Sequence, residues 1–60
     1  MPNAQELLKR AEKAEAEKNY IEAGPLFERA GDIERAIANY RKGGGVDRAA
    51  MLLEATGRAK

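Results

Sequence analysis

Residues 19–57 consist of three consecutive blocks of thirteen residues, NYIEAGPLFERAG (19–31), DIERAIANYRKGG (32–44) and GVDRAAMLLEATG (45–57). The second, fifth and ninth positions of every block hold an apolar residue, and the thirteenth position holds glycine. The aligned sets are Tyr20, Ile33 and Val46; Ala23, Ala36 and Ala49; Phe27, Tyr40 and Leu53; and Gly31, Gly44 and Gly57. Agreement at so many positions indicates an internal repeat, the feature to look for first in a helical chain.

Each block has the apolar spacing of an α-helix. In the second block, Ile33, Ala36, Ile37 and Tyr40 stand at i, i+3, i+4 and i+7, so they share one face of a helix. The third block repeats this spacing with Val46, Ala49, Ala50 and Leu53. Alanine with leucine, glutamate, lysine and arginine is also the composition of closely packed helices. The blocks are therefore predicted to be helices and not strands.

The block boundaries predict where the helices begin and end. Asn19 and Asp32 can accept hydrogen bonds from the free N–H groups of a first helical turn, and the closing glycines suit the left-handed residue that ends a helix. Asn3 and Glu6 have capping-box spacing and predict a further helix before the blocks. We expect one all-α domain over residues 1–60, a bundle of four short antiparallel helices near 4–18, 20–30, 33–43 and 46–56.

Gly24 and Pro25 conflict with the second of these helices. Proline lacks an N–H group and its ring crowds the carbonyl four residues earlier. The alternative is one long helix from residue 3 to 23, a break at Gly24 and Pro25, and a short helix over residues 26–30. The thirteen-residue register favours four helices, and a kink near Gly24 is expected in either case.

The predicted core is one stripe from each helix. A chain of sixty residues buries only about 60% of its unfolded surface, so help from a partner chain is plausible. The core residues are expected to be Leu7, Ala11, Tyr20, Ala23, Phe27, Ala30, Ile33, Ala36, Ile37, Tyr40, Val46, Ala49, Ala50 and Leu53.

Residues 19–30 resemble helix B of a tetratricopeptide repeat (TPR), a family of α-solenoids. The matching residues are Ala23, Phe27 and Ala30 in this segment, with Ala11 and Leu7 at the small and large apolar positions of helix A. That family repeats as helix pairs of about 34 residues, whereas the blocks here have thirteen. The resemblance therefore implies a short, single-helix variant of a TPR-like stack, used for binding proteins.

Side chains for most catalytic and metal chemistry are missing. The chain has no histidine, cysteine, serine or tryptophan, so Ser-His-Asp and Cys-His sites are impossible and the usual zinc ligands are absent. Glu12 and Glu15 could form a carboxylate pair, but a solvated helix surface explains them better. We expect no enzyme activity, no cofactor and no metal.

The net charge of the chain also limits the classes of partner that it is expected to bind. The net charge is +1, with acids and bases mixed along the chain, which argues against nucleic acid and anionic membranes. No stretch approaches the ~20 apolar residues of a membrane span, and a cytoplasmic location is expected. The predicted partner is a protein or a second copy of the chain, as a homo-oligomer.

Two surfaces are predicted to bind that partner. Met51 and Leu52 flank the apolar stripe of the last helix and are expected to contact another chain or a following repeat; alternatively, this helix packs across the other three and buries both faces. The second surface is expected on the first and third helices, by analogy with concave repeat surfaces, at Gln5, Lys9, Glu12, Asn39 and Lys42.

The predicted function is an interaction or scaffolding module. The alternatives are a purely structural or engineered repeat without a ligand, and a nucleic-acid accessory domain.

Overall fold

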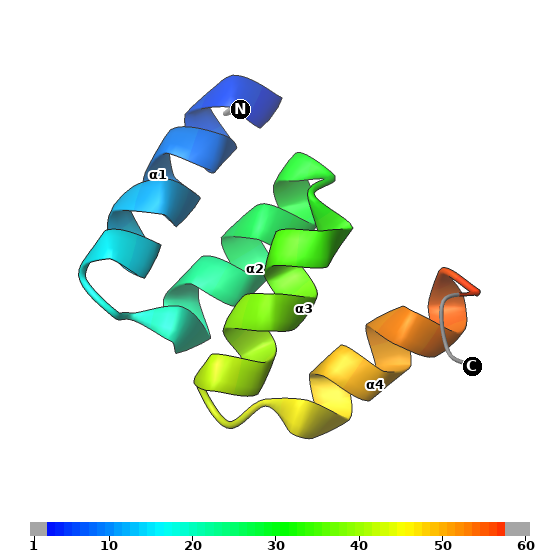
Figure 1. Cartoon of the computed structure of the whole chain (residues 1–60). Coiled ribbons are helices and arrows are strands. Elements are labelled where there is room, and N and C mark those ends of the chain that lie inside the picture. The colour runs from blue at the N-terminus through cyan, green and yellow to red at the C-terminus, as the bar shows by residue number, and fades with distance from the viewer. Residues whose placement is uncertain (1–2, 58–60) are drawn as a thin grey trace.

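The computed structural model describes residues 3–57, which form four α-helices joined by short turns (Figure 1). The helices are α1 (Ala4–Ala16), α2 (Tyr20–Ala30), α3 (Ile33–Lys42) and α4 (Val46–Ala55). The described residues contain no strand, so the predicted all-α fold class is confirmed. The alternative with one long first helix is wrong, because α1 ends well before Gly24 and α2 continues through Pro25.

Pro25 is tolerated inside α2 because it lies on the solvent side of the helix. Its missing N–H group would have donated to the carbonyl of Ile21, whose side chain is also exposed. Water can replace a lost backbone hydrogen bond at such a position. The thirteen-residue register therefore continues across the proline.

The three turns between helices have the same hydrogen-bonding pattern. Lys18, Gly31 and Gly44 have φ angles of 62°, 90° and 87°. The N–H group of the next residue then donates to a carbonyl five residues earlier, as Asn19 does to Ala14 (2.8 Å), Asp32 to Phe27 (2.9 Å) and Gly45 to Tyr40 (2.6 Å). At Lys18 the left-handed conformation costs about 1–2 kcal/mol. The first helix ends at Ala16 and not at the expected residue 18. The prediction missed this end because lysine, unlike glycine, does not indicate a left-handed residue after a helix.

The caps agree with the expected ones at two helix starts out of three. The Asn3 Oδ1 accepts from the Glu6 N–H at 2.9 Å, and the Asp32 Oδ1 accepts from the Arg35 N–H at 3.3 Å. Asn19 makes no such cap; its Nδ2 donates to the Glu22 Oε2 at 2.8 Å instead.

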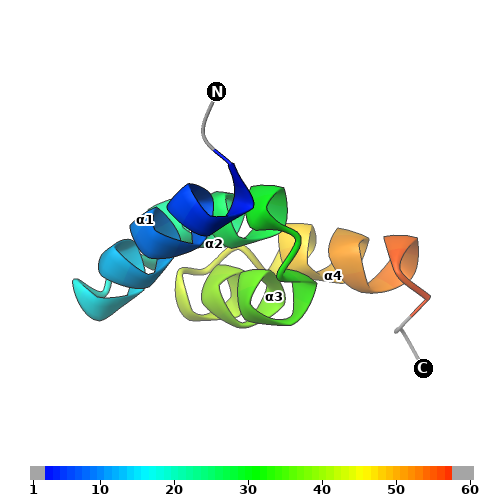
Figure 2. The ribbon, with the colours of Figure 1, turned by 90° about the horizontal axis from the view of Figure 1, so that it is seen from above.

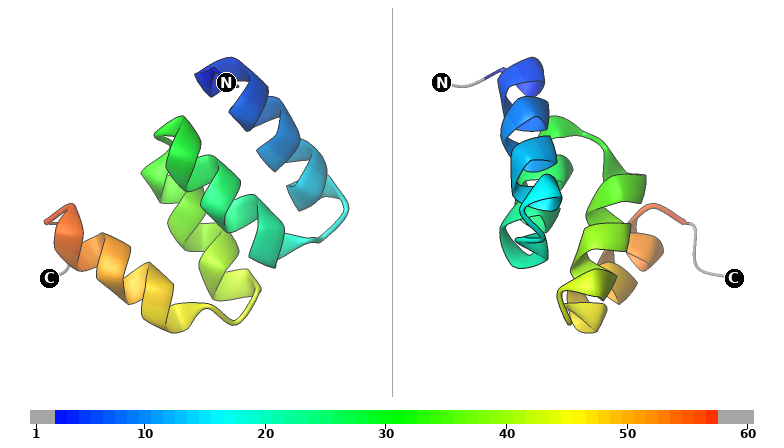
Figure 3. Two further views of the ribbon diagram at one scale, coloured as in Figure 1. Left: turned by 180° about the vertical axis from the view of Figure 1, so that it is seen from behind. Right: turned by 60° about the vertical axis from the view of Figure 1, so that its left-hand side comes forward.

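The helices follow one another across the molecule in chain order, α1 on α2, α2 on α3 and α3 on α4. Figure 2 shows α3 on one side of the layer formed by α1 and α2, and both views of Figure 3 place α4 at the opposite edge from α1. The described part measures 31 × 22 × 14 Å. Within residues 3–57, no helix is both long and apolar enough to cross a bilayer.

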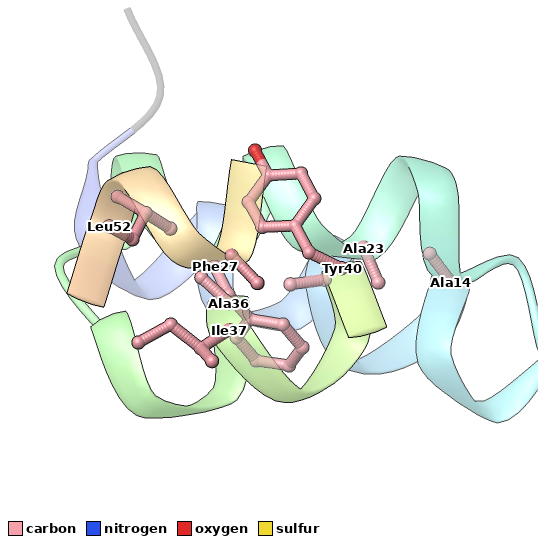
Figure 4. Close-up of a cluster of buried hydrophobic side chains, with 9 residues drawn as sticks. Ala14, Ala23, Phe27, Ala36, Ile37, Tyr40 and Leu52 are labelled. Atoms are coloured by element: carbon pink, nitrogen blue, oxygen red, sulfur yellow. The ribbon is translucent and has the colours of Figure 1, made fainter. Parts of the chain in front are cut away.

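The core lies around Phe27 of α2, which is fully buried. In Figure 4 this ring lies with Ala36 and Ile37 of α3, while the Tyr40 hydroxyl points out of the cluster. The buried apolar cluster consists of Ala11, Ala14, Ala23, Phe27, Ala36, Ile37, Tyr40, Ala49 and Leu52.

The repeat begins at residues 6–18, one block earlier than predicted. Leu7, Ala11 and Ala14 stand at the second, sixth and ninth positions of this block, and all three are buried. Its fifth and eighth positions are Arg10 and Lys13, where the later blocks hold alanine and then leucine or asparagine. These two charged residues hid the register of the first helix.

Each helix uses one face for its predecessor and another for its successor. The fifth and eighth positions are exposed only in α1, at Arg10 and Lys13, and no described helix precedes α1. The second and sixth positions are exposed only in α4, at Val46 and Ala50, and no described helix follows α4. The fifth and eighth positions therefore face the preceding helix, and the second, sixth and ninth face the following one.

Two of the expected core residues are corrected by this pattern. Val46 is 60% exposed and Ala50 is also exposed, because α4 has no successor among the described residues to cover them. The half-buried members of the expected core are Tyr20, Ala30, Ile33 and Leu53. The buried members are Leu7, Ala11, Ala23, Phe27, Ala36, Ile37, Tyr40 and Ala49.

Gly24, at the sixth position of its thirteen-residue block, allows α3 to pack close to α2. A Cβ atom at Gly24 would lie 2.9 Å from two atoms of the Tyr40 ring. We expect Gly24→Ala to lower the free energy of unfolding by about 1–2 kcal/mol, because overpacking outweighs the roughly 1 kcal/mol gain in helix propensity. In a Tyr40→Leu background the same change should become neutral or stabilising. Urea unfolding of the four proteins measures this, and equal effects in both backgrounds would contradict the contact.

Candidate partner-binding surface

The uncovered face of α4 is an apolar stripe that we call the α4 seam, formed by Val46, Ala50 and Leu53. These residues stand at i, i+4 and i+7, so they align along one side of the helix. Val46 and Ala50 are exposed and Leu53 is half-buried. In α1, α2 and α3 the equivalent positions are buried or half-buried beneath the next helix. The α4 seam therefore has the composition of a surface that packs against a helix.

Polar residues and one methionine border the seam. Asp47 and Glu54 are exposed on the solvent side of α4, and Met51 is 58% exposed beyond them. On the side toward the bundle, Ala49 and Leu52 are buried against α3. An apolar stripe with a charged border is the usual anatomy of a small protein-binding surface.

A hollow lies between α1 and α2 and has a volume of about 550 Å³. Its apolar residues include Ile21, which is 72% exposed, and Pro25. The full lining is Arg10, Lys13, Ala14, Glu17, Ile21, Glu22, Pro25 and Leu26. Four of these eight residues are charged, two of each sign, so this groove suits water better than it suits an apolar helix face.

Arg35 connects α3 to α1. Its Nη1 donates to the Glu12 Oε2 at 3.1 Å, its Nε lies 3.0 Å from the Asp32 Oδ2, and its guanidinium lies 5.3 Å from the centroid of Phe27. The hydrogen bond to Glu12, with the nearby acids, raises the pKa of Arg35. These groups are largely exposed, so the contact orients the helices more than it stabilises them.

Glu28 connects α2 to both later helices. The Tyr40 hydroxyl donates to the Glu28 Oε1 at 2.7 Å, and the Arg48 Nη2 lies 3.4 Å from both carboxylate oxygens. Burial of the phenol, followed by its hydrogen bond to Glu28, raises the pKa of Tyr40. The neutral phenol is therefore the form that the fold stabilises.

Asn39 is a fully buried polar side chain between α1 and α3. Its Nδ2 donates to the Glu15 Oε2 at 2.9 Å and to the Arg35 carbonyl at 2.8 Å, while its Oδ1 has no hydrogen-bond partner. Leu26 and Leu52 occupy the same eighth position in the neighbouring blocks. Asn39 therefore replaces an apolar contact with a directional one.

The seven residues that were predicted to bind a partner differ in their exposure and do not form one surface. Gln5 and Lys9 are exposed on α1, and Glu12 is exposed but bound to Arg35. On α4, Met51 is exposed. The Nζ atom of Lys42 lies 5.5 Å from the centroid of the Tyr20 ring.

The remaining two, Asn39 and Leu52, are corrected. Both stand at the eighth position, which faces the preceding helix, so α1 and α2 cover Asn39 and α3 covers Leu52. They were expected on the surface because the eighth position was taken to lie beside the apolar face of the helix and not in it. The polar side chain of Asn39 supported that interpretation.

The α4 seam was not predicted, because Val46, Ala50 and Leu53 have the spacing of core residues and were expected in the core. The sequence feature that could have predicted this surface is the place of α4 as the last repeat. In a stack of helices, the face that is buried in an inner helix becomes a surface in the last one.

The described residues contain no group of three or more acidic, histidine or cysteine side chains that could hold a metal ion. Comparison of the chain with protein-family models, with curated proteins and with solved structures finds no match. The geometry of the helices is therefore the basis for inferring a function.

Asn39→Asp should destabilise the fold strongly at neutral pH. It replaces a donor by a carboxylate that faces the Glu15 carboxylate and the Arg35 carbonyl, and we expect a loss of about 2–4 kcal/mol. Adding Glu15→Gln should restore part of the stability, because the amide can donate to the new carboxylate. Acidification should also shrink the loss. Equal urea midpoints of Asn39→Asp and the native chain would contradict the buried contact.

Tyr40 should make stability depend on alkaline pH. Its pKa is raised in the folded chain, so its contribution is complete below the unfolded pKa of about 10 and is lost as pH rises through the folded pKa. In a Tyr20→Phe background, tyrosinate absorbance should therefore appear at higher pH in the folded chain than in urea. The free energy of unfolding should fall above pH ~10, and adding Tyr40→Phe should remove this contribution. A folded midpoint at or below the urea midpoint would contradict it.

Proposed function

We propose that the protein is a non-catalytic protein–protein interaction or scaffolding module of TPR-like, short helical-repeat type, and that the α4 seam is its binding surface. The observation behind this proposal is the comparison of equivalent positions. The second and sixth positions are covered by a neighbouring helix in α1, α2 and α3 but exposed in α4, at Val46 and Ala50.

Two further features support a helical partner. The seam runs along a ten-residue helix and its three apolar residues keep the i, i+4, i+7 spacing that a partner helix can follow. Stacked helical repeats bind partners through surfaces that continue from one repeat to the next. The cytoplasmic location stays a prediction from the sequence.

A purely structural repeat without a ligand is the alternative function. It differs from the proposal in what Val46 and Ala50 do, because exposed apolar side chains in a structural repeat only add a modest solubility cost. Binding that depends on these two residues separates the two functions.

Selection from a library of helical peptides, with the full chain as bait, tests the proposal. We expect the enriched peptides to shift the NMR amide signals of Val46, Ala50 and Leu53, and to lose at least about tenfold in affinity with Ala50→Glu, because a buried unpaired charge is costly at an apolar interface.

Ile21→Glu is the matched control, since it also adds a charge at an exposed apolar position but lies on α2, in the hollow between α1 and α2. It should leave binding unchanged, and circular dichroism should show both variants folded. Enrichment of no helical peptide, or peptides that ignore Ala50→Glu, would refute the proposal.

A further inference from the structure

The fourth position of a block makes contact two helices back. Arg35, at the fourth position in α3, pairs with Glu12 of α1 at 3.1 Å, and Arg48, at the fourth position in α4, pairs with Glu28 of α2 at 3.4 Å. Glu28 stands at the tenth position of its block. Glu12 stands at the seventh position of its block. A helix that docks on the α4 seam in the same manner brings its own fourth position to the seventh or the tenth position of block 32–44, which are Ala38 and Arg41, and of these two only Arg41 is charged.

The fifth and eighth positions determine how closely such a helix can pack. The fifth position is alanine in all three helices that lie on a predecessor, and it is 0–2% exposed in each of them. The eighth position is Leu26, Asn39 or Leu52 in the same helices. Inside the chain, each helix therefore packs on its predecessor through a small residue at the fifth position and a larger residue three positions later.

We propose that the α4 seam, together with Arg41, binds a helix of a partner protein with the pattern acidic residue–Ala–x–x–Leu. The alanine packs at the seam beside Ala50, the leucine covers Leu53, and the acidic residue meets the exposed guanidinium of Arg41. This inference rests on the proposed function and adds the chemistry of the partner. The same order of residues occurs inside the chain at Glu22, Ala23 and Leu26 of α2, the helix that packs on α1.

A second copy of the chain does not satisfy this pattern through α1. The fourth, fifth and eighth positions of α1 are Lys9, Arg10 and Lys13, and all three are exposed. Head-to-tail stacking would bring Lys9 to Arg41 and would place two more cations on the apolar seam. Like charges and desolvated, unpaired cations both oppose such a contact. The occupant is therefore a helix with the opposite charge at that position.

The interface is small. A ten-residue helix is about 15 Å long, so the contact falls in the class below about 1,200 Å² that contains weak and transient complexes. We expect affinities in the micromolar range or weaker, and single charge contacts then have a measurable effect on binding.

Matched synthetic peptides of residues 45–57 test the pattern, because this block already has Ala49 and Leu52 at its fifth and eighth positions. One peptide keeps Arg48 at the fourth position and the other has Arg48→Glu. A side-chain lactam on the solvent side should hold both helical, since isolated helices of this length are marginal in water.

Titration into the full chain, followed by NMR, should show the Arg48→Glu peptide binding roughly three- to tenfold more tightly than the native peptide, the difference between an attractive and a repulsive exposed charge pair. With Arg41→Glu in the protein the order of the two peptides should reverse, and with Arg41→Ala the difference should disappear. A third peptide with Ala49→Lys and Leu52→Lys, which copies the cations of α1, should not bind. Added salt should reduce the preference between the first two.

Equal affinities for the first two peptides, or a preference that survives Arg41→Glu, would overturn the pattern. Sedimentation that shows the native chain pairing through α4, lost with Ala50→Glu, would overturn it as well, because the occupant would then be a second copy. The proposed function fails by a different result, namely no binding at the α4 seam by any helical peptide. A seam that binds selected peptides without an acidic residue–Ala–x–x–Leu pattern leaves the function standing and removes only this inference.

Discussion

Ala23, Ala36 and Ala49 lie between consecutive helices at intervals of thirteen residues, and each is almost completely buried. A methyl group at this position lets two helices approach closely, and a larger side chain would force them apart or off their rotamers. The helices have only ten to thirteen residues and are marginal in isolation. The packing of each alanine on the preceding helix therefore holds short helices together that have little stability of their own.

A helix packs on the preceding helix with one face and on the following helix with another. The two ends of the described stack therefore expose different faces. Wherever a described neighbour is present, a helix turns the fifth and eighth positions of its block to the helix before it and the second, sixth and ninth positions to the helix after it. At α1 the first of these faces carries Arg10 and Lys13 and is suited to water. At α4 the second face carries Val46 and Ala50 and is apolar but uncovered. One end of the described stack therefore exposes charged side chains, and the other exposes apolar ones.

Much of the fold was predictable, because the apolar period and the closing glycines are local signals. The helices from residue 20 onward begin at the predicted residues and end within one residue of the predicted ones. The first helix was harder, since Arg10 and Lys13 stand at repeat positions and Lys18 adopts the left-handed conformation that glycine provides elsewhere. The candidate surface was predicted least well. Val46 and Leu52 are both aliphatic, and only the presence or absence of a neighbouring helix decides that the first is exposed and the second buried.

Polar contacts between helices two apart add selectivity to a stack whose apolar contacts are nearly interchangeable. Alanine at the fifth position would pack on any of the neighbouring helices, but Arg35 finds Glu12 and Arg48 finds Glu28 only when the helices are in chain order. Exposed pairs contribute little stability, so their effect is to penalise wrong neighbours, where like charges would meet. Asn39 acts in the same way from inside the core, because its Nδ2 needs the Glu15 carboxylate at the correct level of α1. In the proposed complex the surface of α4 works in the same way: the apolar seam provides the contact area, and the charge of Arg41 selects the partner helix.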